Sequence, residues 1–171
     1  FSFPAAYASI IKEAILQLNE KLTGSRYLKG VNKIGGVTAA LDENKKNVLL
    51  KSLKEIKNDF NEIREILYSS VSFMDRVDTT GILKRKTAVD LGIVGLAARA
   101  SGIPSDLRKF YPGVYKEAKF AITLEQSGDC LARLKVRVKE FEESCRLIEF
   151  FASRILGKEN LYSSRQCKVP D

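Results

Sequence analysis

The sequence predicts a mainly α fold: a bundle of two long amphipathic helices plus shorter helices, with minor β strands. Two runs of apolar residues carry this prediction, because both keep the spacing of three and four residues that places side chains on one helix face. The runs are Leu49, Leu53, Ile56, Phe60, Ile63, Leu67, Val71 and Met74, and Leu131, Leu134, Val138, Phe141, Cys145, Ile148, Ala152 and Ile155. Their shared period of about 3.5 residues favours packing of the two helices at a shallow angle.

The start of the chain predicts a shorter helix followed by a glycine-rich loop. Ser2 and Pro4 are typical of a helix start, and apolar residues then recur at helical spacing from Ala5 to Leu22. Gly24 ends this pattern. Residues 30–37 contain too many glycines for a helix interior, so we expect a loop with a short extended piece.

Asp42 is a suitable N-cap for the first long helix, which we expect to continue as far as Met74. Residues 75–86 then read as a connection. Thr87 is the expected N-cap of a short helix that ends after Leu91, since a glycine follows.

Apolar periodicity assigns no structure to residues 92–102, which combine apolar residues with three glycines. Residues 119–124 are expected to form a short strand, and Asp129 is expected to cap the second long helix. Residues 158–171 show no period, so we expect a loose tail. Residues 1–171 have the length of a single domain.

Composition excludes several kinds of chemistry. The chain has no histidine, which rules out an imidazole base, a Ser-His or Cys-His nucleophile and a His-ligated metal within it. Its three cysteines, Cys130, Cys145 and Cys167, form no C-x-x-C motif. If Cys130 and Cys145 share one helix, they lie about 22 Å apart and cannot form a disulfide. This sparse, odd number is typical of a reducing compartment.

The net charge of +8 permits an acidic partner, but the pattern argues against nucleic acid. Basic residues over 133–139 are followed directly by acidic residues over 140–143, which predicts a self-neutralising helix surface. No apolar run is long enough to cross a membrane, no basic-then-apolar leader pattern opens the chain, and the first residue is Phe1 instead of methionine. We therefore expect a processed or excised piece without a direct transmembrane span.

Charged residues and glycines are dense between positions 92 and 133. Such residues among apolar neighbours are expected to form buried charge pairs that fix loops, and this structural role is favoured over catalysis. The residues in question are Arg99, Asp106, Arg108, Asp129, Arg133 and, just beyond, Arg137.

Several short motifs in one order resemble a known family. They are Gly95 to Ile103, Asp106 to Lys109, Tyr111, Tyr115, Gly128 to Cys130, Arg133, Arg137, Glu140, Ser144, Arg146 and Ile148, with Gly24 to Arg26 and Gly35 to Val37 upstream. Over roughly residues 17–156 the sequence resembles the large subunit of energy-converting nickel-iron hydrogenases, of the formate hydrogenlyase type, and its relative, the quinone-site large subunit of respiratory Complex I. Leu96 and Ile34 stand where family members usually carry proline.

The resemblance implies a scaffold segment of a membrane-associated nickel-iron hydrogenase or NADH-quinone oxidoreductase-like electron-transfer complex. The C-x-x-C pairs that hold nickel and iron in the hydrogenases, and the His and Tyr that meet quinone in Complex I, have no counterpart here. No cofactor is therefore expected on this segment; a nickel-iron centre or a quinone is expected only in the complete parent subunit. This chain alone is expected to be inactive. The implied partner is an iron-sulfur small subunit, and the implied location is the cytoplasmic face of the membrane.

We expect no catalytic residue and no metal ligand in the chain, but we do expect residues that pin loops or face a subunit boundary. The candidates for this role are Arg26, Gly35, Gly36, Arg99, Ser101, Asp106, Arg108, Asp129 and Arg133. Two alternatives remain open: a metal-free helical interaction module derived from this family and, on charge alone, a basic helical protein that binds nucleic acid.

Overall fold

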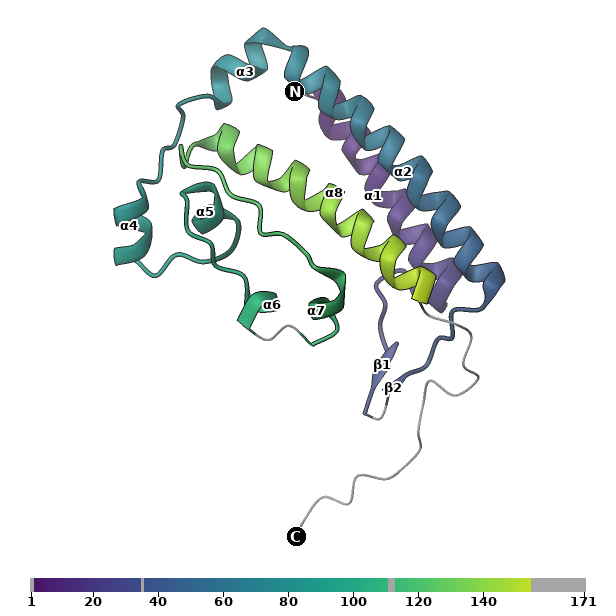
Figure 1. Ribbon diagram of the computed structural model, residues 1–171. Coiled ribbons are helices and arrows are strands. Elements are labelled where there is room, and N and C mark those ends of the chain that lie inside the picture. Colours follow the sequence, from purple (N-terminus) through teal and green to yellow (C-terminus); the bar gives the residue numbers. More distant parts are fainter. Residues whose placement is uncertain (1, 35, 111–112, 155–171) are drawn as a thin grey trace. The chain divides into compact units, whose positions relative to one another are not determined.

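A computed structural model describes residues 2–34, 36–110 and 113–154 of the chain (Figure 1). The chain divides into two compact units, one made of residues 1–61 and 151–171 and the other of residues 62–150. The mainly helical prediction is confirmed. Gly35 and the predicted tail 158–171 lie outside the described residues.

The first unit contains helix α1 (Ser2–Thr23), strands β1 (Asn32–Lys33) and β2 (Gly36–Val37), and most of helix α2 (Glu43–Ser69). The buried side chains of α1 and α2 in this unit are Ile11, Leu18, Leu53 and Ile56. Helix α1 ends as predicted at Gly24, which has a φ of +76°. The two strands pair antiparallel, with Asn32 opposite Val37, so the expected short extended piece is a hairpin.

Helix α2 begins as predicted but ends earlier. The Asp42 carboxylate accepts a hydrogen bond from the Lys45 N–H at 2.7 Å, as expected of an N-cap. Continuation to Met74 was wrong, because Ser70 leaves the helical region (φ −82°, ψ 102°) and caps a separate helix, α3 (Val71–Val77). Val71 is 73% exposed, so the apolar stripe does not continue across this break.

The second unit contains α3, the end of α2 and most of α8, together with four short helices. These are α4 (Arg85–Asp90), α5 (Gly95–Ala100), α6 (Leu107–Phe110) and α7 (Tyr115–Ala118). The predicted N-cap at Thr87 is wrong, because α4 begins one turn earlier after Lys84.

The strand predicted over residues 119–124 is also wrong. Lys119 has a left-handed φ of +48°, and the Ala121 N–H donates to the carboxylate of Glu143 rather than to a neighbouring strand. A strand needs a partner for its backbone groups, and β1 and β2 are the only strands within the described residues. The apolar residues of this segment serve packing instead, and Phe120 is 3% exposed.

Helix α8 (Cys130–Arg154) is capped by Asp129 as predicted, with the Ala132 N–H donating to the carboxylate at 2.7 Å. Its buried face departs from the predicted stripe, since Ile148 is 39% exposed whereas Leu147 and Val136 are buried. A strict 3.5-residue repeat drifts around a straight helix by roughly 20° per heptad, which moves the buried face to neighbouring positions. Val136 packs with Ala132, Ala100 and Leu96, which joins α8 to α5.

Candidate functional site

Three backbone segments meet at the N-terminal end of α8 in the second unit. The Gly128 N–H donates to the Ala100 carbonyl and the Gly128 carbonyl accepts from the Leu83 N–H, both at 2.9 Å. The Ser101 hydroxyl, 1% exposed, donates to the Leu83 carbonyl at 2.9 Å. A Cβ at Gly128 would lie 2.1 Å from the Leu83 oxygen, so only glycine fits here.

Asp129 holds this crossing together through hydrogen bonds to its own chain. Its side chain is buried, and its carboxylate accepts from the Ala132 N–H at 2.7 Å, the Ser127 hydroxyl at 3.0 Å and the Thr79 N–H at 3.1 Å. Burial by itself raises the pKa of Asp129, but these hydrogen bonds outweigh it and hold the pKa below the usual value for an aspartate. The carboxylate therefore stays charged at neutral pH.

Arg133 binds carbonyl groups of the same crossing. Its Nη1 donates to the Gly128 carbonyl at 2.7 Å and to the Gly81 carbonyl at 3.1 Å, and its Nη2 lies 2.9 Å from the Cys130 sulfur. The expectation of charge pairs is therefore wrong for Asp129 and Arg133, because each satisfies backbone groups instead of an opposite charge. Such contacts suit segments that lack the regular hydrogen bonds of a helix or sheet.

Arg99 links three parts of the second unit. Its Nε donates to the carboxylate of Glu140 on α8, and its Nη1 donates to the Ser105 carbonyl at 3.1 Å. The Arg99 carbonyl also accepts from the Glu125 N–H at 3.0 Å. The Arg99 side chain is 13% exposed, so this ion pair is largely shielded from water.

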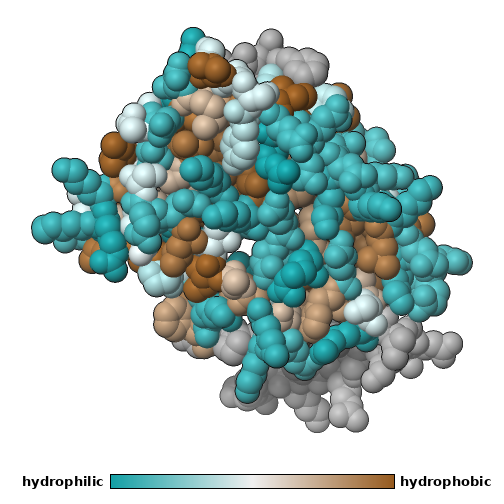
Figure 2. Space-filling view, turned by 45° about the horizontal axis from the view of Figure 1, so that its top comes forward, coloured by the Kyte–Doolittle hydropathy of each residue, from teal (hydrophilic) through white to brown (hydrophobic). Residues whose placement is uncertain are grey.

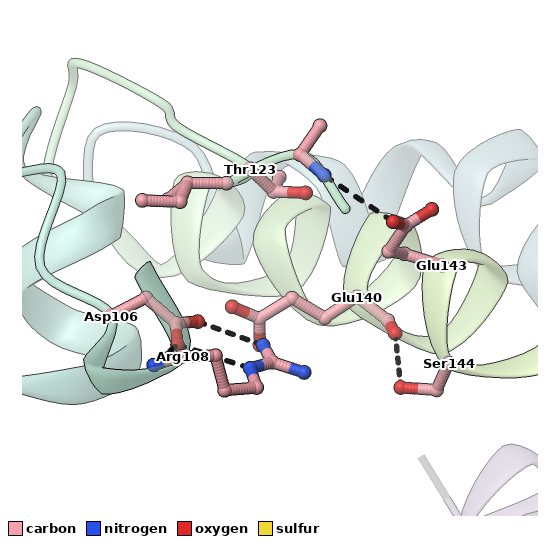
Figure 3. A pocket seen from close by; sticks show the side chains of 8 residues that line it. Asp106, Arg108, Thr123, Glu140, Glu143 and Ser144 are labelled. Atoms are coloured by element: carbon pink, nitrogen blue, oxygen red, sulfur yellow. Dashed lines mark hydrogen bonds and ion pairs between the residues drawn. The ribbon is translucent and has the colours of Figure 1, made fainter. Parts of the chain in front are cut away.

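Asp106 and Arg108 form a local ion pair, so the general expectation of charge pairs in this region holds for these two residues. The guanidinium donates to both carboxylate oxygens, at 3.0 and 2.7 Å, and Figure 3 shows the two groups pointing toward one another. The hydrogen bonds from Arg108 lower the pKa of Asp106 and, in return, the bond to Asp106 raises the pKa of Arg108. Arg108 also lies over the ring of Phe120 at 4.5 Å, a cation-π contact.

Arg26 and Gly36 belong to the first unit. Arg26 donates to both carboxylate oxygens of Glu13 on α1, at 2.9 and 2.6 Å, and its carbonyl accepts from the Asn19 amide at 3.1 Å. The bond to Arg26 lowers the pKa of Glu13. Gly36 has a φ of +148° and starts β2. The candidates therefore form one local set at the start of α8, ion pairs beside it, and a separate contact at the end of α1.

Sequence reasoning missed three residues on which these contacts depend. Glu13 and Glu140 are the acidic partners of Arg26 and Arg99, and both lie on helix surfaces far from them in sequence. Gly128 was named only as the first residue of the motif Gly128 to Cys130 and was not among the candidate site residues. Its one signal was the run Gly-Asp-Cys at a helix start, which carries no information about Leu83, the residue it meets.

One small cavity lies beside the ion pair of Asp106 and Arg108 and offers little room for a cofactor. The cavity lined by Asp106, Arg108, Glu140 and Glu143 has a volume of about 10 Å³, roughly the room of one water molecule (Figure 3). A larger groove of about 420 Å³ lies elsewhere in the second unit. It is lined by Arg64, Tyr68, Glu125, Lys135, Val138, Lys139 and Glu142.

The residues present do not fit a metal centre. No group of three His, Cys, Asp or Glu side chains within the described ranges is arranged to hold a metal ion. Among the described residues, neither Cys130 nor the buried Cys145 forms a disulfide. The predicted lack of metal ligands in the segment stays a prediction for the chain as a whole. None of the helices in the described residues combines the length and apolarity that a membrane span requires.

Comparison with known proteins agrees with the fold and with the order of the motifs. The chain is 34% identical over 144 residues to a subunit of the NADH-quinone oxidoreductase of Methylacidiphilum infernorum and 35% identical over 139 residues to a subunit of the F(420)H(2) dehydrogenase of Methanosarcina mazei. These alignments cover 84% and 81% of this chain but 34% and 37% of the relatives. The chain thus spans about a third of the length of these curated relatives.

A solved structure has a similar fold. The chain resembles a subunit of the membrane-bound sulfane sulfur reductase, an archaeal respiratory membrane complex, with a TM-score of 0.83 and 26% identity. The match covers 92% of this chain and 43% of that subunit. The family described as respiratory-chain NADH dehydrogenase, 49 Kd subunit, matches residues 2–171. With its fold, its motifs and its relatives in agreement, the chain belongs to the family of the 49 Kd subunit of respiratory-chain NADH dehydrogenase.

Proposed function

We propose that this chain is a framework segment of the large subunit of a membrane-associated electron-transfer complex of the NADH-quinone oxidoreductase kind. In this role it shapes loops of the subunit, while the reactive centre is built from residues elsewhere in the parent protein. Family membership supports the kind of complex. The hydrogen bonding of the chain supports the framework role.

One observation carries the framework role: the polar side chains of the candidate set bind the chain itself. Ser101, Asp129 and Arg133 bind backbone groups, and Arg99 binds both Glu140 and a carbonyl. Within the described residues, no buried side-chain nitrogen or oxygen lacks a hydrogen-bond partner. A catalytic or binding group needs capacity to contact a substrate, whereas these groups use theirs to fix loops.

The acceptor of the electrons and the neighbouring subunit are part of the proposal. Relatives named for quinone, for F(420)H(2) and for sulfane sulfur share this segment, so the segment itself does not select the reaction. We favour quinone reduction, because relatives named for it recur in several bacteria. We also propose an iron-sulfur small subunit as the neighbour and the cytoplasmic face of the membrane as the location.

The test uses the intact complex, purified from its own host with Arg99 of this subunit replaced by alanine or lysine. The framework role predicts a large loss of assembled complex for Arg99→Ala, partial rescue by Arg99→Lys, and unchanged quinone reduction per assembled complex. Lys54→Ala, at an exposed position of α2, serves as the control for the loss of a positive charge. Normal assembly with lost activity would instead make Arg99 catalytic and contradict the framework role.

The same preparation separates the remaining possibilities. Stoichiometric nickel in the purified complex would place the parent in the nickel-iron hydrogenase branch, including the formate hydrogenlyase type. Purification of the chain without any redox subunit would favour a metal-free interaction module. Binding of nucleic acid that weakens steeply with salt would favour the basic helical alternative.

A further inference from the structure

The segment from residue 82 to residue 94, which contains α4, exposes several large apolar side chains. Ile82, Val89, Leu91 and Val94 are 54%, 58%, 67% and 74% exposed. Four such side chains within thirteen residues form a local patch, which we call the α4 patch. Apolar side chains this close together on a surface indicate contact with another molecule more often than scattered ones do.

Local structure holds these side chains outward. Ala88 faces the interior of the unit and is fully buried. The Leu91 N–H donates to the Thr87 carbonyl at 3.0 Å, and the Ile93 N–H donates to the Ala88 carbonyl at 2.8 Å. These bonds fix the turn that follows α4, and the Leu91 and Val94 side chains are exposed at and just after this turn. The patch is therefore preformed, which lowers the entropic cost of binding a partner.

The rim of the α4 patch is positively charged. Lys84, Arg85 and Lys86 are consecutive and exposed, and Asp90 balances one of them through an ion pair with Lys86 at 3.0 Å. The Lys84 side chain forms no hydrogen bond or ion pair with any described residue, and the Arg85 side chain reaches only the Gly102 carbonyl, at 3.4 Å. Figure 2 shows apolar side chains next to strongly hydrophilic ones at the left of the view, the side on which α4 lies in Figure 1.

We propose that the α4 patch docks a neighbouring protein chain that presents apolar side chains surrounded by Asp and Glu. An apolar centre with a charged rim is the usual anatomy of a protein interface, and the positive rim selects an acidic counterpart. This inference rests on the proposed function, because it requires the chain to belong to a subunit of the proposed electron-transfer complex.

The geometry favours a protein over a lipid surface. Binding in the plane of a membrane needs a continuous apolar face along an amphipathic helix. Helix α4 has only six residues, and the four apolar side chains come from the helix and from the loops on both sides of it. A patch built from one short helix and two loops lacks such a face, which favours a protein partner over a membrane surface.

The first experiment treats the intact purified complex with a zero-length carbodiimide reagent, which joins lysine amines to carboxylates in direct contact. Mass spectrometry then identifies the joined peptides. We expect Lys84 to be joined to an Asp or Glu of another subunit, which identifies the partner by its residues. Joining of Lys84 only to carboxylates of its own chain would overturn the proposal.

The second experiment compares Lys84→Glu with Lys54→Glu, a matched charge reversal at an exposed position of α2. We expect Lys84→Glu to speed loss of the identified subunit from the complex at least about tenfold, and a reversed charge at the partner's joined carboxylate to restore retention. Leu91→Ser should weaken retention without changing its salt dependence. Equal retention of the identified subunit in the two charge variants would overturn the proposal. The proposal would also be overturned if Lys84→Glu weakened binding of the complex to anionic lipid vesicles while the subunit was retained. These outcomes do not depend on quinone reduction.

Discussion

Gly128 lies where two backbone segments approach more closely than any side chain allows. Its φ is +67° and a Cβ would meet the Leu83 carbonyl oxygen at 2.1 Å, so Gly128→Ala combines backbone strain with a steric clash. We expect it to lower the free energy of unfolding by about 3 kcal/mol or more. The measurement is urea denaturation of the chain followed by circular dichroism.

Gly92→Ala is the matched control for this substitution. Gly92 has a similar φ of +62°, but an added Cβ would meet nothing within 4 Å. The strain alone should cost about 1–2 kcal/mol. If the two variants lose the same stability, the close approach of Gly128 to Leu83 contributes nothing and the description of the crossing is wrong.

Asp129 makes stability depend on pH in a defined direction. Because its pKa is lower in the folded chain than in the unfolded one, the charged carboxylate stabilises the fold above the unfolded value, and this contribution is lost as the pH falls below about 4. Asp129→Asn should cost about 1–3 kcal/mol at neutral pH and flatten the loss of stability in acid. Asp106 and Glu143 also have lowered pKa values, so part of the acid sensitivity should remain. The measurement is chemical denaturation of the unchanged chain and of Asp129→Asn between pH 3 and 7. If the free energy of unfolding changes with pH equally in both proteins, this role of Asp129 is contradicted.

For single residues, the sequence can indicate hydrogen-bond and ion-pair partners only when the two residues lie close together along the chain. Asp106 and Arg108, which form an ion pair, are two residues apart, although the sequence analysis expected charge pairs here without assigning partners. The partners of Arg133 are backbone carbonyls of Gly81 and Gly128, which no pattern of side chains records. Residue types therefore indicated where polar contacts gather, but not which groups they join.

Helices, as elements, were more predictable than single contacts, because a periodic stripe uses many residues at once. Asp42 and Asp129 cap their helices as expected. The break at Ser70 was missed, since serine is not a strong helix breaker and the apolar period continues through it. The false strand at 119–124 has another cause: short apolar runs look alike in a strand and in a packed irregular segment.

The correction to the buried face of α8 leads to a prediction at the scale of that helix. Val136 is fully buried against Ala100 and Ala132, whereas Ile148, which the periodic stripe placed in the core, is 39% exposed. Val136→Ala should therefore cost about 2 kcal/mol, and Ile148→Ala less than about 1 kcal/mol. Thermal denaturation of both variants checks the order. A larger loss of stability for Ile148→Ala than for Val136→Ala would contradict this order and would support the buried face that the sequence predicted.

In the molecule as a whole, the hydrogen bonding of buried polar groups is the structural feature that supports the framework role. The described residues leave no buried side-chain nitrogen or oxygen without a partner, and they contain no group arranged to hold a metal. A fold that needed a metal would be stabilised by many kcal/mol on binding it. The framework role instead implies that the loops around α5 and the start of α8 keep their shape through the chain's own hydrogen bonds.

Independence from metal is a prediction that can be measured on the chain itself. Scanning calorimetry with and without EDTA should give melting temperatures that agree within about 1 °C, because a ligand stabilises a protein only if the folded state binds it. Elemental analysis of the untreated chain should find less than about 0.1 nickel or iron per molecule, since tight binding needs several well-placed ligands. As a control, Arg99→Ala should lower the melting temperature by several degrees in both conditions, because it leaves Glu140 without its guanidinium partner. A melting temperature that falls on chelation, together with stoichiometric nickel, would mean that the segment holds part of the reactive centre and is more than a framework.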